Sequence, residues 1–595
     1  LVKTLVISED RRFYSHSGLD LEAFVRVAFG FLTLHPAGGG STITQQLAKN
    51  LYTKNPNRSL DGYIAKLGRY PRRFVEKTKE WIIAVDLEKN FTKKEIIAMY
   101  LNTVEFSNNT YGIKVAAETY FNKSPDSLNL QESAVLVGML QNPSRYNPKK
   151  YPDRALAKRN AVLAKVYSHG YKIKTRKQYD SLLGLPLKLN FTIQNQNQGQ
   201  ATYFRTVLSN YLINYCKKKG IDLWNSGLKI YTTLDSRVQR HAEEAMNAHM
   251  SYLQRSFFRE WKARNRNPWS DDHGAEIPDF LQRRVKQTEA YKDYAARYGN
   301  DPQALQQALH TKRKMTIFTW KGERDTLFNT MDSLNYYKRF LQSGLLAMDP
   351  NTGHVKAWVG GFNHKYFKFD HVAQGKRQPG STFKPFVYGL AMESGHSPCE
   401  ILKDITPQFF IDGQSPWYPT NADGTKGSGR PMNLRQAMAR SVNSITAQMI
   451  QLLGAQNVVE FAHRVGIQSR LDAVPSLCLG TSDVSLLEMV DAYCTFVNGG
   501  LQIKPLFITR IEDKNGNVID NFVADTKHAI NEQTAYKMLY MLKGGVDERG
   551  GTSRGLSWDL KANNDLGGKT GTTNNASDGW YVGVTHNLVC GVWVG

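Results

Sequence analysis

The residues best suited to chemistry lie within residues 379–386 (PGSTFKPF), where Ser381 and Lys384 are three positions apart. On a helix this spacing places both side chains on one face, a hydroxyl beside an amine. Such a serine is a nucleophile if burial or a nearby cation lowers the pKa of the amine. Gly380 suits a helix start, where the serine meets the positive end of the helix dipole. The spacing alone also recurs by chance in long chains.

Two later sequence segments, together with Ser381 and Lys384, form a set of three motifs. Ser441 and Asn443 follow at the mouth of a helical run, and residues 568–573 (GKTGTT) supply Lys569. In this order the three elements resemble the SxxK, SxN and KTG motifs of penicillin-recognising serine enzymes. The resemblance implies an α/β penicillin-binding domain, similar to the serine β-lactamases, over residues 341–595.

The same resemblance implies a role for each residue. Ser381 attacks the carbonyl carbon of a D-Ala-D-Ala peptide, and Lys384 is the general base. Ser441 relays a proton to the departing D-Ala amine, while Asn443 holds the peptide amide. Lys569 and Thr570 bind the terminal carboxylate. The backbone N–H groups of Ser381 and Thr572 form the oxyanion site, and Gly571 is also expected to bind substrate. β-Lactam antibiotics are expected to bind covalently at Ser381.

A second group of polar residues opens the chain. Residues 7–18 (ISEDRRFYSHSG) contain Glu9 and Asp10, and residues 38–50 (GGGSTITQQLAKN) lead from three glycines into a helix that carries Lys49. Backbone N–H groups at a glycine-rich helix start, with a lysine, can cradle phosphate. The segment is not a Walker loop, because it lacks the pattern GxxxxGK[ST].

These two segments and three later ones resemble, in order, the five motifs of peptidoglycan glycosyltransferases. The later motifs lie at Lys77 and Glu80, at residues 94–102 (KEIIAMYLN) and at residues 112–121 (GIKVAAETYF). Together with the SxxK, SxN and KTG motifs later in the chain, these five motifs make the chain resemble a class A penicillin-binding protein. A multidomain chain is then expected, in which residues 1–170 form a mainly α, lysozyme-like glycosyltransferase domain.

The resemblance also implies the chemistry of this second site. Glu9 is the general base at the acceptor sugar hydroxyl, Lys49 steadies the pyrophosphate leaving group, and Glu80 assists at that end. No cofactor is required, although a divalent ion, Mg²⁺ or Mn²⁺, near Glu80 remains an option. The other residues expected to bind substrate are Asp10, His16, Ser41, Thr42, Gln45 and Lys77.

The third motif departs from the family pattern, which usually opens with Arg-Lys, whereas this chain has Glu76 and Lys77. One pyrophosphate contact therefore needs another residue, and the candidates are Arg58, Arg69, Arg72 and Arg73. The apolar segment at residues 24–34 (FVRVAFGFLTL) is either a bilayer contact or a buried core helix.

Length and composition agree with several folded domains. The chain has 595 residues, of which 41% are apolar and 22% charged, as in ordinary globular proteins. A mixed, polar region at residues 171–340 is expected to join the two domains. Within it, residues 250–335 are either a partner-docking surface or a solvated helical insert. From residue 344, two strands joined by a turn at residues 350–353 open the α/β domain.

The net charge and the cysteine spacing limit the classes of binding partner and of structural site. The net charge of +24 favours an anionic partner, and a membrane surface fits better than nucleic acid, for which no binding motif is found. The five cysteines lack CxxC spacing, which favours neither a zinc site nor a disulfide framework. By resemblance, the substrates are lipid II and nascent glycan strands, and cell-wall synthesis proteins are further candidate partners.

The expected location follows from the same resemblance. No run of 18 or more apolar residues occurs, and both ends of the sequence look cut. A class A penicillin-binding protein is expected to have a single N-terminal transmembrane anchor, missing from this sequence, in the bacterial inner membrane. Both catalytic domains then lie outside the cytoplasm.

Two alternatives to this bifunctional synthase remain. A serine β-lactamase or D,D-carboxypeptidase would use the same Ser381 chemistry and pass the acyl group to water, but it would need no helical N-terminal domain. A catalytically silent cell-wall scaffold or sensor would carry the motifs without turnover. A synthase that polymerises lipid II with inversion and crosslinks stem peptides explains both motif sets.

Overall fold

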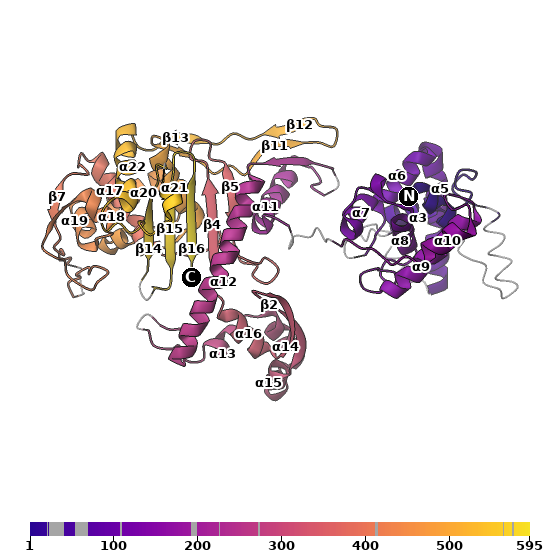
Figure 1. Cartoon of the computed structure of the whole chain (residues 1–595), viewed down its shortest axis with the longest axis horizontal. Coiled ribbons are helices and arrows are strands. Elements are labelled where there is room, and N and C mark those ends of the chain that lie inside the picture. The colour runs from indigo at the N-terminus through magenta and orange to yellow at the C-terminus, as the bar shows by residue number, and fades with distance from the viewer. Residues whose placement is uncertain are drawn as a thin grey trace. The chain divides into compact units, whose positions relative to one another are not determined.

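The structure is a computed structural model, and it describes residues 1–20, 22, 41–53, 69–107, 110–191, 199–224, 226–271, 274–410, 415–562, 564–573 and 576–595. The chain forms two compact units, Leu1–Asn195 and Gln196–Gly595 (Figure 1). The domain boundaries expected at residues 170 and 340 stay predictions. Several sequence features lie outside the described part, namely the glycines at residues 38–40, the apolar segment at residues 24–34, Arg58, and the side chains of Arg69, Arg72, Arg73 and Glu76.

Helices build the first unit. Short polar residues start several of them, and Thr92 and Asn129 each form a capping box with the glutamate three positions later. Their apolar faces meet in one core, where Phe13, Tyr100 and Leu136 are fully buried. The described helices are α1 Val2–Glu9, α3 Ile43–Ala48, the π-helical η1 Lys49–Thr53, α5 Arg69–Asn90, α6 Lys93–Thr103, α7 Ile113–Phe121, η2 Pro125–Ser127, α8 Leu130–Leu140, α9 Pro152–Ser168 and α10 Arg176–Leu183.

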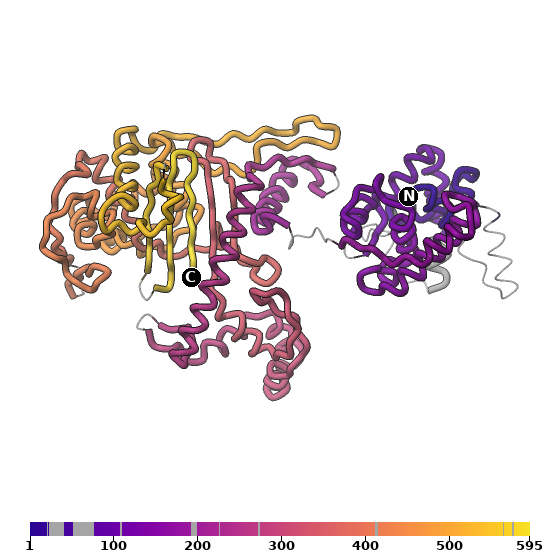
Figure 2. Tube along the Cα trace, in the orientation of Figure 1, coloured from indigo at the N-terminus to yellow at the C-terminus, as the bar shows by residue number. Residues whose placement is uncertain are grey.

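A five-stranded antiparallel sheet with the order β14-β15-β16-β4-β5 forms the centre of the second unit (Figures 1 and 2). The hairpin predicted from residue 344 onward is confirmed as β4 and β5, with Gly353 in the left-handed conformation, φ 69°, in the turn. Strand β14 lies at one edge of the sheet. The strands are β4 Ser343–Met348, β5 Val355–Val359, β14 Gly567–Thr572, β15 Gly579–Val584 and β16 Val589–Val594.

Helices cover both faces of this sheet, because side chains along each strand alternate between the faces. On one face, Ala347 packs with Met246 of the long helix α12 Ser236–Arg264. On the other face, Leu346 and Met348 join the main core. The helices around that core are η3 Gly380–Phe383, α17 Lys384–Glu393, α18 Leu434–Ala439, α19 Asn443–Leu453, α20 Ala455–Val465, η4 Pro475–Leu479, α21 Leu486–Val497 and α22 Glu532–Asp547.

The region at residues 250–335 folds into the end of α12 and a lobe that packs through Phe318 and Phe340. The lobe contains α13 Phe280–Val285, α14 Glu289–Tyr298, α15 Pro302–His310, β2 Arg313–Thr319, β3 Gly322–Phe328 and α16 Thr330–Lys338. The smaller elements of the second unit are α11 Thr202–Lys219, β1 Lys229–Thr232, β6 Lys376–Arg377, β7 Ile401–Lys403, β8 Pro431–Asn433, β9 Val484–Ser485, β10 Leu501–Ile503, β11 Ile508–Glu512, β12 Val518–Asn521, β13 Thr526–His528 and α23 Trp558–Lys561. Among the helices that the structure describes, none combines the length and the apolarity needed to cross a membrane.

Two candidate active sites

The buried side chain of Lys384 lies at the centre of the first site. Lys384 begins α17, one turn after Ser381 in η3, and it is fully buried. Its Nζ donates hydrogen bonds to the carbonyl oxygen of Ser441 at 2.6 Å, to Ser441 Oγ at 3.2 Å and to Asn443 Oδ1 at 2.6 Å. The fold therefore brings the SxN residues to the SxxK turn, as the motifs predict.

Lys569 on β14 joins this site from the sheet. Its Nζ donates to Ser441 Oγ and to the carbonyl oxygen of Thr570, both at 2.9 Å. The Ser441 hydroxyl thus lies between two lysine side chains. Ser441 has φ 60°, a left-handed conformation that is uncommon for a residue with a side chain. This conformation lets both the carbonyl oxygen and the hydroxyl of Ser441 face Lys384, and strained backbone of this kind gathers at functional sites.

Burial sets the protonation of the two lysines. It lowers the pKa of Lys384 to about 7, because a buried ammonium group loses the solvation that stabilises its charge. Burial, together with the positive charge of Lys384, also places the pKa of Lys569 well below its ordinary value. Near neutral pH, Lys384 therefore populates both protonation states, as a general base for Ser381 requires.

The backbone of β14 closely approaches the turn that carries Ser381. A Cβ atom on Gly571 would lie 2.4 Å from the carbonyl oxygen of Pro379, and one on Gly380 would lie 2.8 Å from that of Thr572. Neither glycine therefore tolerates a side chain, and Gly380, at φ 54°, also needs the left-handed conformation. The close approach brings the backbones of η3 and Thr572 together, which is what an oxyanion site built from both requires.

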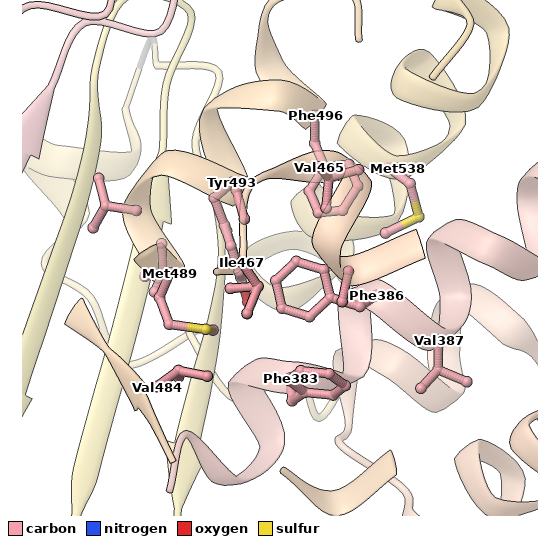
Figure 3. Close-up of a cluster of buried hydrophobic side chains, with 14 of the residues drawn as sticks. Phe383, Phe386, Val387, Val465, Ile467, Val484, Met489, Tyr493, Phe496 and Met538 are labelled. Atoms are coloured by element: carbon pink, nitrogen blue, oxygen red, sulfur yellow. The ribbon is translucent and has the colours of Figure 1, made fainter. Parts of the chain in front are cut away.

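Large apolar side chains anchor the turn in the hydrophobic core (Figure 3). Phe383 and Phe386 follow Ser381 into the core, with ring centroids 4.9 Å apart. The Tyr493 hydroxyl donates a hydrogen bond to the carbonyl oxygen of Thr382 at 2.7 Å. Because a close-packed core allows few alternative rotamers, the position of the Ser381 backbone is well determined.

The second site is a cavity of about 510 Å³ in the first unit. Glu9 reaches it from the last turn of α1, Lys49 from η1, and Lys77 and Glu80 from α5. Lys77 Nζ donates to Ser41 Oγ at 3.1 Å and to Glu80 Oε2 at 2.5 Å. The lining consists of Ser8, Glu9, Ser41, Gln46, Lys49, Asn50, Lys77, Glu80, Val104, Glu105, Leu140, Gln141, Pro143, Lys158 and Lys165.

Four other predicted binding residues form a hydrogen-bonded group at the start of α3: Asp10, His16, Thr42 and Gln45. Asp10 Oδ2 accepts the N–H of Ile43 at 2.9 Å, and His16 Nε2 lies 3.1 Å from both Asp10 oxygens. Thr42 Oγ1 and Gln45 Nε2 both donate to the carbonyl oxygen of Gly18, at 2.7 and 3.2 Å. These bonds fix α3, which leads directly to Lys49. Substrate binding by the four residues stays a prediction.

Sequence reasoning missed two lysines in the wall of this cavity. Lys158 and Lys165 lie two turns apart on α9, and Lys158 bonds to Gln141. Lys165 Nζ donates to the carbonyl oxygen of Ser8 at 2.7 Å, in the last turn of α1 beside Glu9. The only sequence signal was a pair of lysines at helical spacing, which is common in so basic a chain.

Three family models match the chain. They are Transglycosylase over residues 1–167, Penicillin-binding protein middle domain over residues 264–341, and Penicillin binding protein transpeptidase domain over residues 344–592. Penicillin-binding protein 1A of Aquifex aeolicus is 31% identical over 612 residues, which cover 100% of this chain and 78% of that protein. Penicillin-binding protein 1A of Neisseria flavescens is 30% identical over 638 residues, with 100% and 75% covered.

A solved structure agrees with these matches. Penicillin-binding protein 1A from Haemophilus influenzae has the same fold, with a TM-score of 0.56 at 23% identity over 91% of this chain and 84% of that one. The expected mainly α and α/β catalytic domains are thereby confirmed.

A transglycosylase domain and a transpeptidase domain on one chain define a bifunctional peptidoglycan synthase. The chain belongs to the class A penicillin-binding proteins, the family of the proteins named penicillin-binding protein 1A. It is both a peptidoglycan glycosyltransferase and a D-Ala-D-Ala transpeptidase. A free-standing β-lactamase or carboxypeptidase and a silent scaffold are set aside, because neither explains both catalytic domains.

Proposed function

We propose that Ser381 is the nucleophile of the transpeptidase site and Lys384 its general base. Neutral Lys384 takes the hydroxyl proton while Ser381 Oγ bonds to the carbonyl carbon of the penultimate D-Ala. Ser441 passes a proton to the terminal D-Ala amine as the C–N bond breaks. An acceptor amine then attacks the ester, loses a proton to the same relay, and frees Ser381. The observation that carries this mechanism is the buried Lys384, bonded to Ser441 and Asn443 one turn from Ser381.

The donor peptide lies along β14, the edge strand next to η3, and pairs with its backbone. Lys569 and Thr570 bind the terminal carboxylate through charge-assisted hydrogen bonds. The N–H groups of Ser381 and Thr572 stabilise the oxyanion, which the close approach at Gly571 supports. A β-lactam presents its ring carbonyl in the same position and leaves an acyl group on Ser381.

The cavity of the first unit binds the sugars and pyrophosphates of lipid II and of the growing glycan strand. Glu9 removes the proton of the acceptor hydroxyl, and the new bond forms at the anomeric carbon with inversion. The pyrophosphate leaves toward Lys49 and Lys77. Glu80, hydrogen-bonded to Lys77, orients that cation for the leaving group.

The proposed mechanism routes no step through a metal ion. Mg²⁺ is usually held by one or two carboxylates together with waters and substrate phosphates, and the carboxylate of Glu80 is already paired with the Lys77 ammonium. Within the described ranges, no group of three or more His, Cys, Asp or Glu side chains is arranged to hold one. The surroundings of Glu80 therefore fit the Lys77 ammonium group better than a bound divalent ion.

We propose that both units lie outside the cytoplasm, at the bacterial inner membrane, where a single N-terminal transmembrane anchor holds them. Lipid II is embedded in that membrane, so its polymerase must work at the membrane surface. The net charge of +24 supports this location, because anionic headgroups attract basic proteins. Cell-wall synthesis proteins are further partners in this scheme, and nucleic acid is not.

Lipid II given to the purified chain tests both halves. The parent is expected to make crosslinked polymer, and Ser381→Ala to make polymer without crosslinks. Glu9→Gln is expected to make no polymer while it reacts with a fluorescent penicillin at the parent rate. Glu118→Gln, the same change in the same unit outside the cavity lining, is the control and keeps both activities. Polymer from Glu9→Gln, or a penicillin adduct on Ser381→Ala, would contradict the assignment.

A further inference from the structure

A loop that contains none of the catalytic motifs contacts the transpeptidase site. Strands β7 and β8 pair with each other, and the described parts of the loop between them are residues 404–410 and 415–430. Its residues Thr420 and Asn421 contact the first residue of α19, Asn443. The loop is therefore in a position to set the geometry of the SxN motif.

Asn421 caps α19 from outside the helix. The N-cap residue is Val442, whose side chain cannot accept a hydrogen bond. Instead, Asn421 Oδ1 accepts the N–H of Asn443 at 2.8 Å and the N–H of Ser444 at 3.2 Å. Two of the N–H groups that every helix start leaves unpaired are thus satisfied by a residue 22 positions earlier in the chain.

The buried carboxylate of Asp404 fixes the orientation of this amide. Asp404 is only 5% exposed. Its Oδ1 accepts from Asn421 Nδ2 at 3.2 Å and from the Ser444 hydroxyl, and its Oδ2 accepts the N–H and the hydroxyl of Ser428, both at 2.8 Å. If the Asn421 amide flipped, its oxygen would face a carboxylate and its NH₂ would face two N–H groups. Asn421 Oδ1 must therefore point at the start of α19.

The side chain of Asn443 is held from both ends. Its Nδ2 donates to the carbonyl oxygen of Thr420 at 2.7 Å, and its Oδ1 accepts from Lys384 Nζ at 2.6 Å. The loop thus determines where one of the three acceptors of the Lys384 amine lies. A displacement of the loop would reach Lys384 through a single side chain.

We propose that Asn421 and Asp404 are positioning residues of the acyl-transfer reaction, holding Asn443 where it bonds to Lys384. Asp404 sets the Asn421 amide, Asn421 sets the first turn of α19, and Asn443 passes the geometry to Lys384. Both act through Asn443 rather than on the reacting atoms. Their role rests on the proposed function of Ser381 and Lys384.

Loss of this positioning should change the pH dependence of acylation, whereas simple destabilisation of the fold should not. The hydrogen bond from Lys384 to Asn443 Oδ1 favours the ammonium form, so its loss lowers the pKa of Lys384 further. The titratable groups that face Lys384 from other elements are Lys569 on β14 and Cys478 on η4. A substitution at Asn421 changes neither of them. The acid limb of the acylation rate should therefore move to lower pH.

The test uses the full chain and measures acylation by a fluorescent penicillin from about pH 5 to about pH 9. In Asn421→Ala we expect acylation at neutral pH to fall at least about tenfold, with the acid limb displaced to lower pH and polymerisation of lipid II unchanged. Asp404→Asn, which turns one acceptor of the carboxylate into a donor, should displace the limb in the same direction. Asp423→Asn is the matched control, since Asp423 lies in the same loop, is exposed, and bonds to Thr425.

Two outcomes would contradict the positioning role of Asn421 and Asp404. A folded Asn421→Ala protein that acylates within about twofold of the parent rate, at an unchanged pH midpoint, would overturn the inference. A loss of acylation that only follows the fraction of unfolded protein, with no displacement of the limb, would also overturn it. If Asn421→Ala does not fold, Asn421→Ser and Asp404→Asn decide by the same criteria. An adduct on Ser381→Ala, run in parallel, would instead refute the proposed nucleophile.

Discussion

At the scale of single residues, the protonation of Lys384 gives the most direct prediction. Its pKa of about 7 means that the neutral base is lost as pH falls through this value. The rate of Ser381 acylation by a penicillin should therefore rise with pH, reach half its plateau near pH 7 and stay level above it. Lys384→Arg should slow acylation at least about a hundredfold, because a guanidinium keeps its proton. A midpoint near the ordinary lysine value of about 10.4 would contradict the base assignment.

Lys165 gives a second prediction at this scale. Its ammonium group binds a carbonyl oxygen in the last turn of α1, where the helix dipole is negative and Glu9 is presented to the cavity. Lys165→Met should slow polymerisation of lipid II about fivefold, or about 1 kcal/mol, while Lys165→Arg retains the rate. Lys114→Met, an exposed change on α7 of the same unit, serves as the control. Equal polymerisation rates for the two methionine variants would show that Lys165 is a surface residue without a role in the reaction.

At the scale of elements, the contact of β14 with η3 determines the acyl site. Gly571→Ala should reduce penicillin acylation at least about tenfold, because its Cβ would overlap the carbonyl oxygen of Pro379 and push the strand away from Ser381. Gly555→Ala is the matched control, since a Cβ at Gly555 meets no atom within 4 Å. Acylation rates and melting temperatures of both variants check this. If the two variants acylate at the same rate, the close approach does not matter for the reaction.

The helices and strands differ in how far the sequence predicts them and the contacts that they make. Capping residues such as Thr92 and Asn129, and the turn residues 350–353 between β4 and β5, are local signals, so these elements were predictable. The acyl site was predictable because its three motifs occur in a set order. The cap from Asn421 and the bond from Lys165 join residues 22 and 157 positions apart. Only tertiary packing creates such pairs, and single residues of these types carry no local signal.

At the scale of the whole molecule, the positive charge is unevenly shared. The first unit, Leu1–Asn195, holds 30 Lys and Arg against 16 Asp and Glu, which gives +14 of the net +24 in about a third of the chain. In the proposed mechanism this unit acts on a lipid-linked substrate, and each basic residue near an anionic membrane contributes about 1 kcal/mol of attraction. The charge excess therefore lies where attraction to a membrane surface is useful.

The full chain should consequently cosediment with vesicles that contain anionic lipid at about 0.1 M salt and be released as salt approaches about 1 M, because the Debye length falls from about 10 Å to about 3 Å. Neutral vesicles of the same size are the control and should bind weakly at every salt concentration. Binding that is equal on both vesicles and unaffected by salt would mean that apolar contacts hold the protein at the surface. In that case the charge excess would serve the pyrophosphate groups of the substrate rather than the headgroups of the membrane.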